Sequence, residues 1–348
     1  MSDMPGQPAP TGLADSAIPG LAAGRPEERP GRRKRRGLRI TLVVLASFVV
    51  LVGAVAGGGF LYLNHMVNSI QRMPVTFTKV AGYEDYGGAM TVLITGQELG
   101  PTGDTHITSP HASGLIMLLH VSAEGYNGSV VSIPPQVIVR VPGHGRMELE
   151  NALKTGGPSL LVATVEHLTH LQINHYARID FTHVDRAVNA MHGVNVILPD
   201  QTDGFGHVFH IGVNHLTGLT ALDYAREQDL GEEGRVLRQQ ALMRAIVRKL
   251  VHQHLLTNPV MGFRVLHAFI SMLTVDSNFT IAELRRVARQ IGGLTGSADY
   301  VTAPYHLRQG QEHLDRRITR QLWVAIREDE IAAFARKYPF TVTPVAPR

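Results

Sequence analysis

A short stretch in the second half of the chain gathers residue types that bind phosphate. On a helix that starts near Gly234, the residues Arg235, Arg238 and Gln239 fall at positions i, i+3 and i+4, so they share one face. Two arginines in a first turn oppose the helix dipole, which makes them a poor choice for stability alone. The same turn has free backbone N–H groups, and these groups together with guanidinium forks favour a phosphate or pyrophosphate site.

Arg226 ends the helical segment that precedes this stretch, and we expect its side chain to converge on the same site. A second interpretation is open. The arginines would then pair with Glu227, Glu232 and Glu233 on a solvated surface, which is the common fate of such residues.

Other catalytic classes find little support in the sequence. There are no cysteines, which excludes disulfides, thiol nucleophiles and zinc sites built on cysteine. His207, His210 and His215 lie close together, but no carboxylate completes a recognisable zinc spacing, so surface histidines are the simpler interpretation. No Gly-x-Ser-x-Gly motif is present.

The elements that would position these residues alternate between strands and helices. Strands are expected at Val75–Val80, Met90–Thr95, Leu115–Val121, Ser129–Ile133, His175–Phe181 and Val194–Leu198. Helices are expected after Pro158 and at His183–Met191, Leu216–Arg226, about 235–255, about 260–273 and Ile281–Gln290. This alternation predicts an α/β or α+β fold with a central mixed β-sheet flanked by helices.

An apolar stripe follows the paired arginines on the expected helix. Leu242, Ile246 and Leu250 recur at helical spacing. Such a stripe is ordinarily part of a core, although it would also suit the wall of a lipid-binding slot. The last part of the chain, residues 295–348, carries Trp323 on an expected strand or helix and receives no chemical role.

One segment near the start predicts a membrane anchor. Residues 40–63 contain no charged side chain and exceed the ~30 Å hydrocarbon core at roughly 1.5 Å per residue. The basic run at residues 32–39 places the tail 1–39 in the cytoplasm and the rest outside. A cleaved signal peptide is the competing interpretation, since Ala54-Val55-Ala56 forms an A-x-A pattern, but the leading region is too long for one.

This organisation gives four parts and explains the net charge. A disordered basic tail spans 1–39, a transmembrane helix 40–63, a stalk with a first strand 64–88, and an extracytoplasmic domain 89–348. Of 33 Lys and Arg and 29 Asp and Glu, the tail holds eight and four, so the remainder holds 25 of each sign. A neutral domain argues against a nucleic-acid partner.

The motifs around the arginines resemble those of the LytR–CpsA–Psr (LCP) family, whose members also have an anchor followed by a domain. The segments that carry the resemblance are Met90–Gly96, Ile116–Val121, Ser132–Pro134, Gly156–Pro158, His175–Phe181, Gly212–Gly218, Ala221–Glu227 and Gly231–Gln240. They cover roughly Val92 to Leu250 and occur in the family's order.

The resemblance implies an extracytoplasmic phosphotransferase at the cell membrane. Family members hold a polyprenyl-pyrophosphate-linked glycopolymer, with the lipid in an apolar cleft and the pyrophosphate on arginines near Mg²⁺, and transfer the glycopolymer to peptidoglycan. The implied catalytic residues are Arg226, Arg235 and Arg238, and Gln239 joins them in substrate binding. The implied partners are this glycopolymer, peptidoglycan and membrane lipid. Arginines and a metal suit phosphoryl transfer, in which the protein mainly neutralises and positions charge.

Several motif positions depart from the family pattern. The family's Arg-Ser-Asp-Thr stands here as Ala112-Ser113-Gly114-Leu115, and its Ile-Pro-Arg-Asp as Ile133-Pro134-Pro135-Gln136. The carboxylates left as Mg²⁺ ligands are Glu232 and Glu98. Two hypotheses therefore stand: a divergent but active transferase, and a catalytically impaired relative that binds lipid phosphate or wall polymer as an accessory protein.

Overall fold

The computed structural model of the chain describes residues 65, 68–78, 89–97, 115–122, 128–198, 201–204, 206–226, 238–239, 241–246, 248–249, 259–291 and 300–342. All of them belong to one compact unit, Leu61–Arg348. The expected tail and transmembrane helix, residues 1–39 and 40–63, lie outside this described part. Among the residues just given, no helix has both the length and the apolar character needed to cross a membrane.

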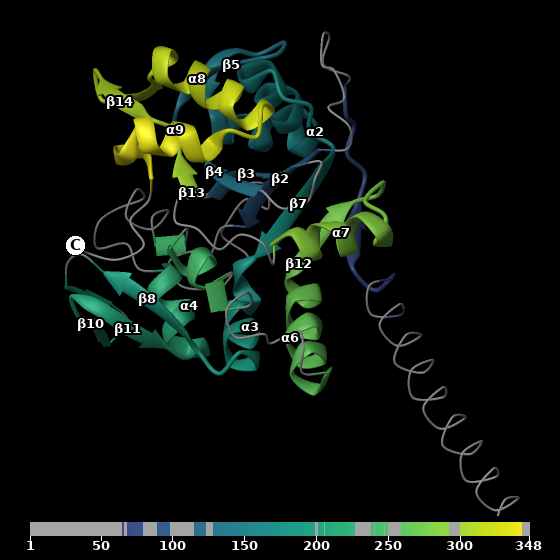
Figure 1. Cartoon of the computed structure of the whole chain (residues 1–348), viewed down its shortest axis with the longest axis vertical. Helices are drawn as coiled ribbons and strands as arrows, with labels where there is room; N and C mark the ends of the chain where they lie inside the picture. Colours follow the sequence, from purple (N-terminus) through teal and green to yellow (C-terminus); the bar gives the residue numbers. More distant parts are fainter. Residues whose placement is uncertain are drawn as a thin grey trace, which may run out of the picture. The chain divides into compact units, whose positions relative to one another are not determined.

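A seven-stranded mixed sheet forms the centre of this unit, which confirms the predicted fold class (Figure 1). The strand order is β1-β12-β7-β2-β3-β4-β13. These strands are β1 (Gln71–Met73), β2 (Met90–Gln97), β3 (Leu115–Val121), β4 (Gly128–Ser132), β7 (His175–Asp180), β12 (Leu273–Asp276) and β13 (Tyr300–Thr302). β2 pairs with β7 in parallel and with β3 antiparallel, and β3 and β4 form a further antiparallel pair.

Helices cover both faces of the sheet, and every side chain of β3 is therefore buried. Ile116 and Leu118 face one core cluster, whereas Leu115 and Met117 face another, as the two-residue period of a strand requires. The first cluster includes residues of α2 (Leu149–Thr169), α8 (Arg316–Arg327) and α9 (Ile331–Lys337). The second includes residues of α3 (Val184–Ala190), α4 (Gly218–Arg226) and α6 (Pro259–Met272). Figure 1 shows the two groups of helices on opposite sides of the sheet.

Short antiparallel pairs surround these layers. They are β5 (Ile138–Val141) with β6 (Gly145–Glu148), β8 (Val194–Leu198) with β11 (Gly212–Leu216), β9 (Thr202–Gly204) with β10 (His207–Phe209), and β14 (Tyr305–Arg308) with β15 (Gln311–Leu314). The remaining elements are α7 (Ile281–Ile291) and the 3-10 turns η1 (Phe181–His183) and η3 (Pro339–Thr341).

A predicted strand boundary differs from the structure, whereas a predicted helix start is confirmed. The first strand is Gln71–Met73, whereas the prediction placed it at Val75–Val80. The helix expected after Pro158 is the second part of α2, and the non-helical residues Gly156 and Gly157 separate it from the part that begins at Leu149. Gly157 has φ 68°, a conformation that glycine adopts without steric cost, so the Gly-Gly-Pro sequence forms the kink between the two helical parts.

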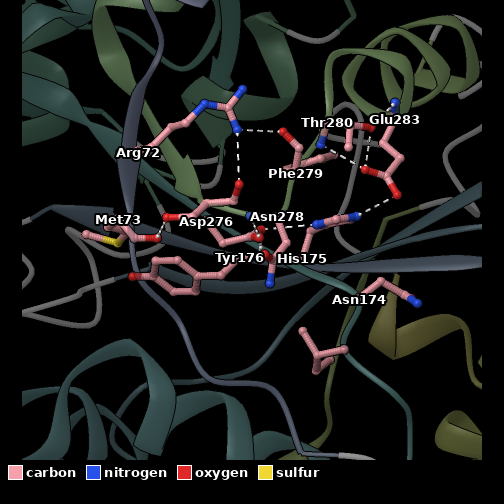
Figure 2. A network of polar contacts seen from close by, with 12 residues as sticks. Arg72, Met73, Asn174, His175, Tyr176, Asp276, Asn278, Phe279, Thr280 and Glu283 are labelled. Carbon is pink, nitrogen blue, oxygen red and sulfur yellow. Dashed lines mark hydrogen bonds and ion pairs between the residues drawn. The ribbon is translucent and has the colours of Figure 1, made fainter.

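A buried polar network ties β1 to the sheet (Figure 2). Asp276, at 0% exposure, accepts hydrogen bonds from the backbone N–H of Tyr176 at 3.0 Å and of Asn278 at 2.9 Å, and its carboxylate lies 3.1 Å from His175 Nδ1. Arg72 donates from Nη1 to the carbonyl oxygen of Phe279 at 2.8 Å. β1 is therefore fastened to β12 and the turn after it, and Asp276 joins β12 to β7.

Candidate functional site

One edge of the sheet brings the motif segments together. The Cα pairs Gly96 with Leu115, Met117 with Ser132, and Gln97 with Asp180 place the ends of β2, β4 and β7 beside the start of β3. Ligands of α/β proteins commonly bind at the carboxyl ends of strands. The two segments that depart from the family pattern adjoin this edge, because residues 112–115 end at the first residue of β3 and residues 133–136 directly follow β4.

The second core cluster connects this edge to α4 and to the following helix. Residues 238–239, 241–246 and 248–249 are helical and are called the Arg238 helix below. Leu115 of β3 and Tyr224 of α4 lie in one cluster with Leu242 and Ile246 of that helix, both of which are fully buried. The stripe containing Leu242 and Ile246 is therefore part of a core.

The end of β2 packs closely against Phe181 of η1 and Leu115 of β3. A Cβ atom on Gly96 would lie 2.6 Å from Cε2 of Phe181 and 3.0 Å from Cβ of Leu115, which is too close for any side chain. The Phe181 ring consequently lies directly against the backbone of β2. This contact anchors η1 at the same edge.

Arg238 and Gln239 lie against the end of α4. Their exposed fractions are only 4% and 1%. The side-chain amide of Gln239 donates to the carbonyl oxygen of Ala225 at 3.4 Å, one residue before Arg226 ends the helix. The fold thus brings the start of the Arg238 helix to the residue that the sequence analysis selected on α4.

Four of the six predicted site residues have no described side chain. Arg235, Glu232 and Glu98 lie outside the described residues, and Arg226 is described only as part of the backbone of α4. The structure therefore brings together Arg238, Gln239 and the α4 backbone at Arg226.

An aromatic ring accompanies the buried arginine. The guanidinium carbon of Arg238 lies 6.0 Å from the ring centroid of Tyr224, which is within the range of a cation–π contact. Burial raises the pKa of Tyr224 to about 12, although the charges of Arg238 and Arg244 oppose this rise. The Tyr224 hydroxyl therefore stays protonated at neutral pH, and its ring also packs edge-on against Phe209 at 5.4 Å.

A second arginine on the same helix is also shielded from water. Burial lowers the pKa of Arg244 to about 10, and the neighbouring charge of Arg248 lowers it slightly further, while Tyr224 and Tyr300 oppose this. Arg244 still carries its charge at neutral pH. Cations held in a low-dielectric setting interact with a phosphate more strongly than cations in water. The arrangement can therefore stabilise a phosphate or pyrophosphate group.

Sequence reasoning missed Tyr224 and Arg244 as parts of this site. Tyr224 lies two residues before Arg226, where its apolar ring suggested only core packing. Arg244 interrupts the apolar residues Met243 and Ala245, and a cation inside a buried segment was the available signal.

The described residues do not supply a metal site by themselves. No group of three or more His, Asp or Glu residues that could hold a metal ion occurs in the described part of the chain. His207 lies 3.1 Å from Asp223, and His215 lies 2.7 Å from Asn195, so each engages a partner of its own. The only carboxylate described at the strand ends is Asp180, 3.6 Å from His183, and one carboxylate does not make a site.

Comparison with known proteins gives a consistent family. The model of the LytR_cpsA_psr family matches residues 63–304. LcpB of Corynebacterium glutamicum, named a probable cell wall biosynthesis protein, is 30% identical over 201 residues, which cover 57% of this chain and 48% of LcpB. TagU of Enterococcus faecalis, named a polyisoprenyl-teichoic acid–peptidoglycan teichoic acid transferase, is 28% identical over 234 residues, covering 64% of this chain and 75% of TagU.

Solved structures share the fold at lower identity. A LytR-Csp2A-Psr enzyme from Actinomyces oris aligns with a TM-score of 0.59 and 18% identity, covering 74% of this chain and 95% of that one. TagT bound to LIIa-WTA aligns with a TM-score of 0.52 and 19% identity, covering 74% and 99%. The chain spans about half the length of LcpB, so these likenesses concern the common domain. The family model covers most of the chain, including both helices of the candidate site, and the chain belongs to the LytR_cpsA_psr family.

Proposed function

We propose that the chain transfers a polyprenyl-pyrophosphate-linked glycopolymer to peptidoglycan. The observation that carries this proposal is the burial of Arg238 and Gln239 against the end of α4, beside Tyr224. A guanidinium group in such a low-dielectric setting interacts with a phosphate more strongly than one in water. The named activity of TagU supports a lipid-linked polymer phosphate as the bound group.

In the proposed reaction the arginines neutralise and orient the pyrophosphate. A peptidoglycan hydroxyl oxygen forms a new bond to the phosphorus next to the glycopolymer. The bridging bond of the pyrophosphate breaks, polyprenyl phosphate leaves, and the hydroxyl proton passes to solvent. Arg226, Arg235 and Arg238 stabilise the charge that develops on the phosphate oxygens, and Gln239 holds the start of the helix in place.

The remaining parts of the chain complete this proposal. Residues 1–39 form a cytoplasmic tail, 40–63 a single membrane span, 64–88 a stalk that includes β1, and 89–348 the extracytoplasmic domain. The span keeps the domain beside the membrane lipid that carries its substrate. Nucleic acid is not among the proposed partners. Mg²⁺ would contribute further neutralisation of the pyrophosphate, with Glu232 and Glu98 as the proposed ligands.

A second candidate function follows from the departures in the motifs. Residues 112–115 and 133–136 lack two arginines and two carboxylates of the family pattern, and each such charge partner typically contributes about 100- to 1,000-fold in rate. The chain would then bind a lipid phosphate or wall polymer without transferring it and would act as an accessory protein.

Measurements of turnover and of lipid binding distinguish the two proposed functions. The full chain in detergent is incubated with a polyprenyl-pyrophosphate-linked glycopolymer, peptidoglycan and Mg²⁺, and released polyprenyl phosphate is measured. We expect Arg238→Gln to lower the rate by about 100-fold or more, because it removes a charge partner of the pyrophosphate. Arg238→Lys keeps the charge but loses the planar fork, so its rate lies between those of Arg238→Gln and the unmodified protein.

The matched control is Arg264→Gln, which removes an exposed arginine of α6 and leaves the rate unchanged. Bound lipid without turnover would support the accessory function in place of the transferase. Neither turnover nor bound lipid would refute both.

A further inference from the structure

A cationic groove lies on the sheet face opposite the Arg238 helix. It has a volume of about 570 Å³ and is bounded by the β5–β6 hairpin, the end of α2, β15 and α8. Its basic lining residues are Arg140, Arg146, Arg316, Arg320, His170 and His313. Among the residues that the structure describes, no Asp or Glu lines it. α2 and α8 pack in the first core cluster, whereas the Arg238 helix packs in the second, so the groove is separate from the candidate transfer site.

The hairpin places two arginines directly opposite each other. Arg140 of β5 and Arg146 of β6 are Cα partners in the antiparallel pair, and both are exposed. Like charges at directly opposite positions destabilise a β-pair. Glu148, on the same face of β6, accepts a hydrogen bond from Asn151 and does not line the groove. The Arg pair therefore has a local energetic cost that the hairpin itself does not explain.

The helix across the groove repeats this arrangement. Arg316 and Arg320 are four residues apart on α8, so they share one face and repel each other. Arg316 is also the first residue of the helix, where a positive charge interacts unfavourably with the helix dipole. The carboxylate of Asp315 accepts from the backbone N–H groups of Arg317 and Ile318 and thus caps the helix.

These arginines do not find anionic partners nearby. Within the ranges that the structure describes, no carboxylate oxygen lies within 4.0 Å of the guanidinium groups of Arg140, Arg146, Arg316 or Arg320. Two elements far apart in sequence thus present unneutralised arginine pairs to one groove.

One histidine, His313, responds to the resulting potential. His306 and His313 are cross-strand partners on β14 and β15, with ring centroids 6.2 Å apart. Loss of solvent contact lowers the pKa of His313, and nearby positive charges, led by that of Arg146, lower it further. His313 is therefore neutral at neutral pH, and the groove's charge comes from its arginines.

The rest of the groove is apolar. Leu168, Leu314 and Trp323 contribute to its lining, and Trp323 is the only tryptophan of the chain. An apolar wall beside several guanidinium groups suits a sugar that carries an acidic substituent, since sugar rings pack on apolar surface while guanidinium forks bind phosphate or carboxylate. A recessed groove fits a chain better than a flat lipid surface.

We propose that the groove between the β5–β6 hairpin and α8 binds an anionic saccharide chain, with the four arginines on its phosphate or carboxylate groups. The groove holds the polymer at a distance from the transfer site and takes no part in bond making. The proposal stands on the residues of the groove and does not depend on the transfer reaction.

Trp323 provides a local reporter for the test. The full chain in detergent is titrated with phosphomannan, polygalacturonate and neutral mannan while tryptophan fluorescence is recorded. We expect the two anionic polymers to change the emission, with affinity that falls as salt rises, and neutral mannan to have no effect. The anionic polymer that binds with the higher affinity shows whether the groove prefers phosphate or carboxylate groups.

Charge-matched variants locate the binding. The double variant Arg140→Gln with Arg146→Gln removes two groove arginines, and we expect about tenfold weaker binding or more. Its thermal midpoint stays the same or rises, because the repelling pair is gone. The control double variant Arg186→Gln with Arg336→Gln removes two exposed arginines outside the groove and keeps the original affinity. If the hairpin variant does not fold, Arg316→Gln with Arg320→Gln replaces it.

Three results would overturn the proposal. They are equal affinity in the groove and control variants, equal binding of neutral mannan, and a fluorescence change only with vesicles of phosphatidylcholine and phosphatidylglycerol, which would assign the groove to a membrane surface. The Arg238→Gln variant distinguishes this proposal from the transferase, because it should lose turnover and keep polymer binding.

Discussion

The carboxyl group of Glu166 is buried inside α2, where an acidic side chain is rare. Its exposed fraction is 3%, and Oε1 accepts hydrogen bonds from Ile173 N at 3.0 Å and Gln172 Nε2 at 2.8 Å. Burial raises its pKa to about 7, and the hydrogen bond from Ile173 opposes this rise only in part. Glu166 therefore favours the folded state while it is protonated and loses this contribution as pH rises through about 7.

Replacing Glu166 with Gln should remove this pH dependence. The amide keeps an oxygen for both hydrogen bonds and cannot ionise, so the variant gains stability over the unmodified protein between pH 4.5 and 7, by at most about 1.4 kcal/mol per pH unit. The free energy of unfolding is measured with denaturant at pH 5 and pH 8, followed by Trp323 fluorescence. Glu328→Gln, an exposed position, is the control. A stability difference that is the same at both pH values would contradict the assignment.

At the scale of elements, carboxylates stabilise the fold in two different ways. Asp276 is fully buried and accepts hydrogen bonds from the backbone of β7 and of the turn after β12. It also contacts the ring of His175, which stacks on Phe279 with ring centroids 3.9 Å apart (Figure 2). Asp315 caps the N-terminus of α8 from the surface side. Thr280 and Glu283 form a reciprocal capping box at the start of α7.

The difference in burial predicts different costs of truncation. Asp276→Ala leaves buried donors without an acceptor and should lower the free energy of unfolding by about 3–5 kcal/mol. Asp315→Ala removes only a helix cap and should cost about 1 kcal/mol. Denaturant unfolding of both variants measures the two values. Equal costs would show that the Asp276 network is not what fastens β1 and β12 to the sheet.

Elements were predictable where one local signal dominates. The strand Leu115–Val121 is a continuous apolar run, and its predicted bounds are confirmed. The strand β12 was missed: the predicted helix, about 260–273, extends into its first residue, Leu273, and no strand was expected at residues 274–276. The first strand was misplaced because an exposed three-residue strand has too few apolar residues to locate it, and its pairing with β12 decides its position.

For the molecule as a whole, the sheet separates the candidate transfer site from the proposed polymer-binding groove. Buried Arg238 lies in the layer of the second core cluster, and the cationic groove lies in the layer of the first. A substrate site and a polymer-binding groove on opposite faces would let one domain hold a long polymer while its end reacts.

The orientation of the chain in the membrane is a prediction at this scale. Alkaline phosphatase fused after Arg348 should be active and green fluorescent protein at the same position dark, because the positive-inside rule keeps the tail 1–39 in the cytoplasm. Neutral replacements at residues 32–36 should weaken this orientation. Fluorescence from a C-terminal fusion of the unmodified chain would contradict the proposed anchor and, with it, access to peptidoglycan.

The sequence by itself determined the strands β2, β3, β4 and β7 of the central sheet, most of the described helices, the mixed α/β class and the family, because these depend on local periodicity and on motifs within a few residues. It also singled out the pair Arg238 and Gln239. Only the tertiary structure decided that Arg238 is buried beside Tyr224 and that Gln239 contacts the end of α4. It also decided that Trp323, which had no predicted role, lines a groove with arginines from β5, β6 and α8. Such neighbours are set by sheet register and helix packing between residues far apart in sequence, and no local pattern encodes those distances.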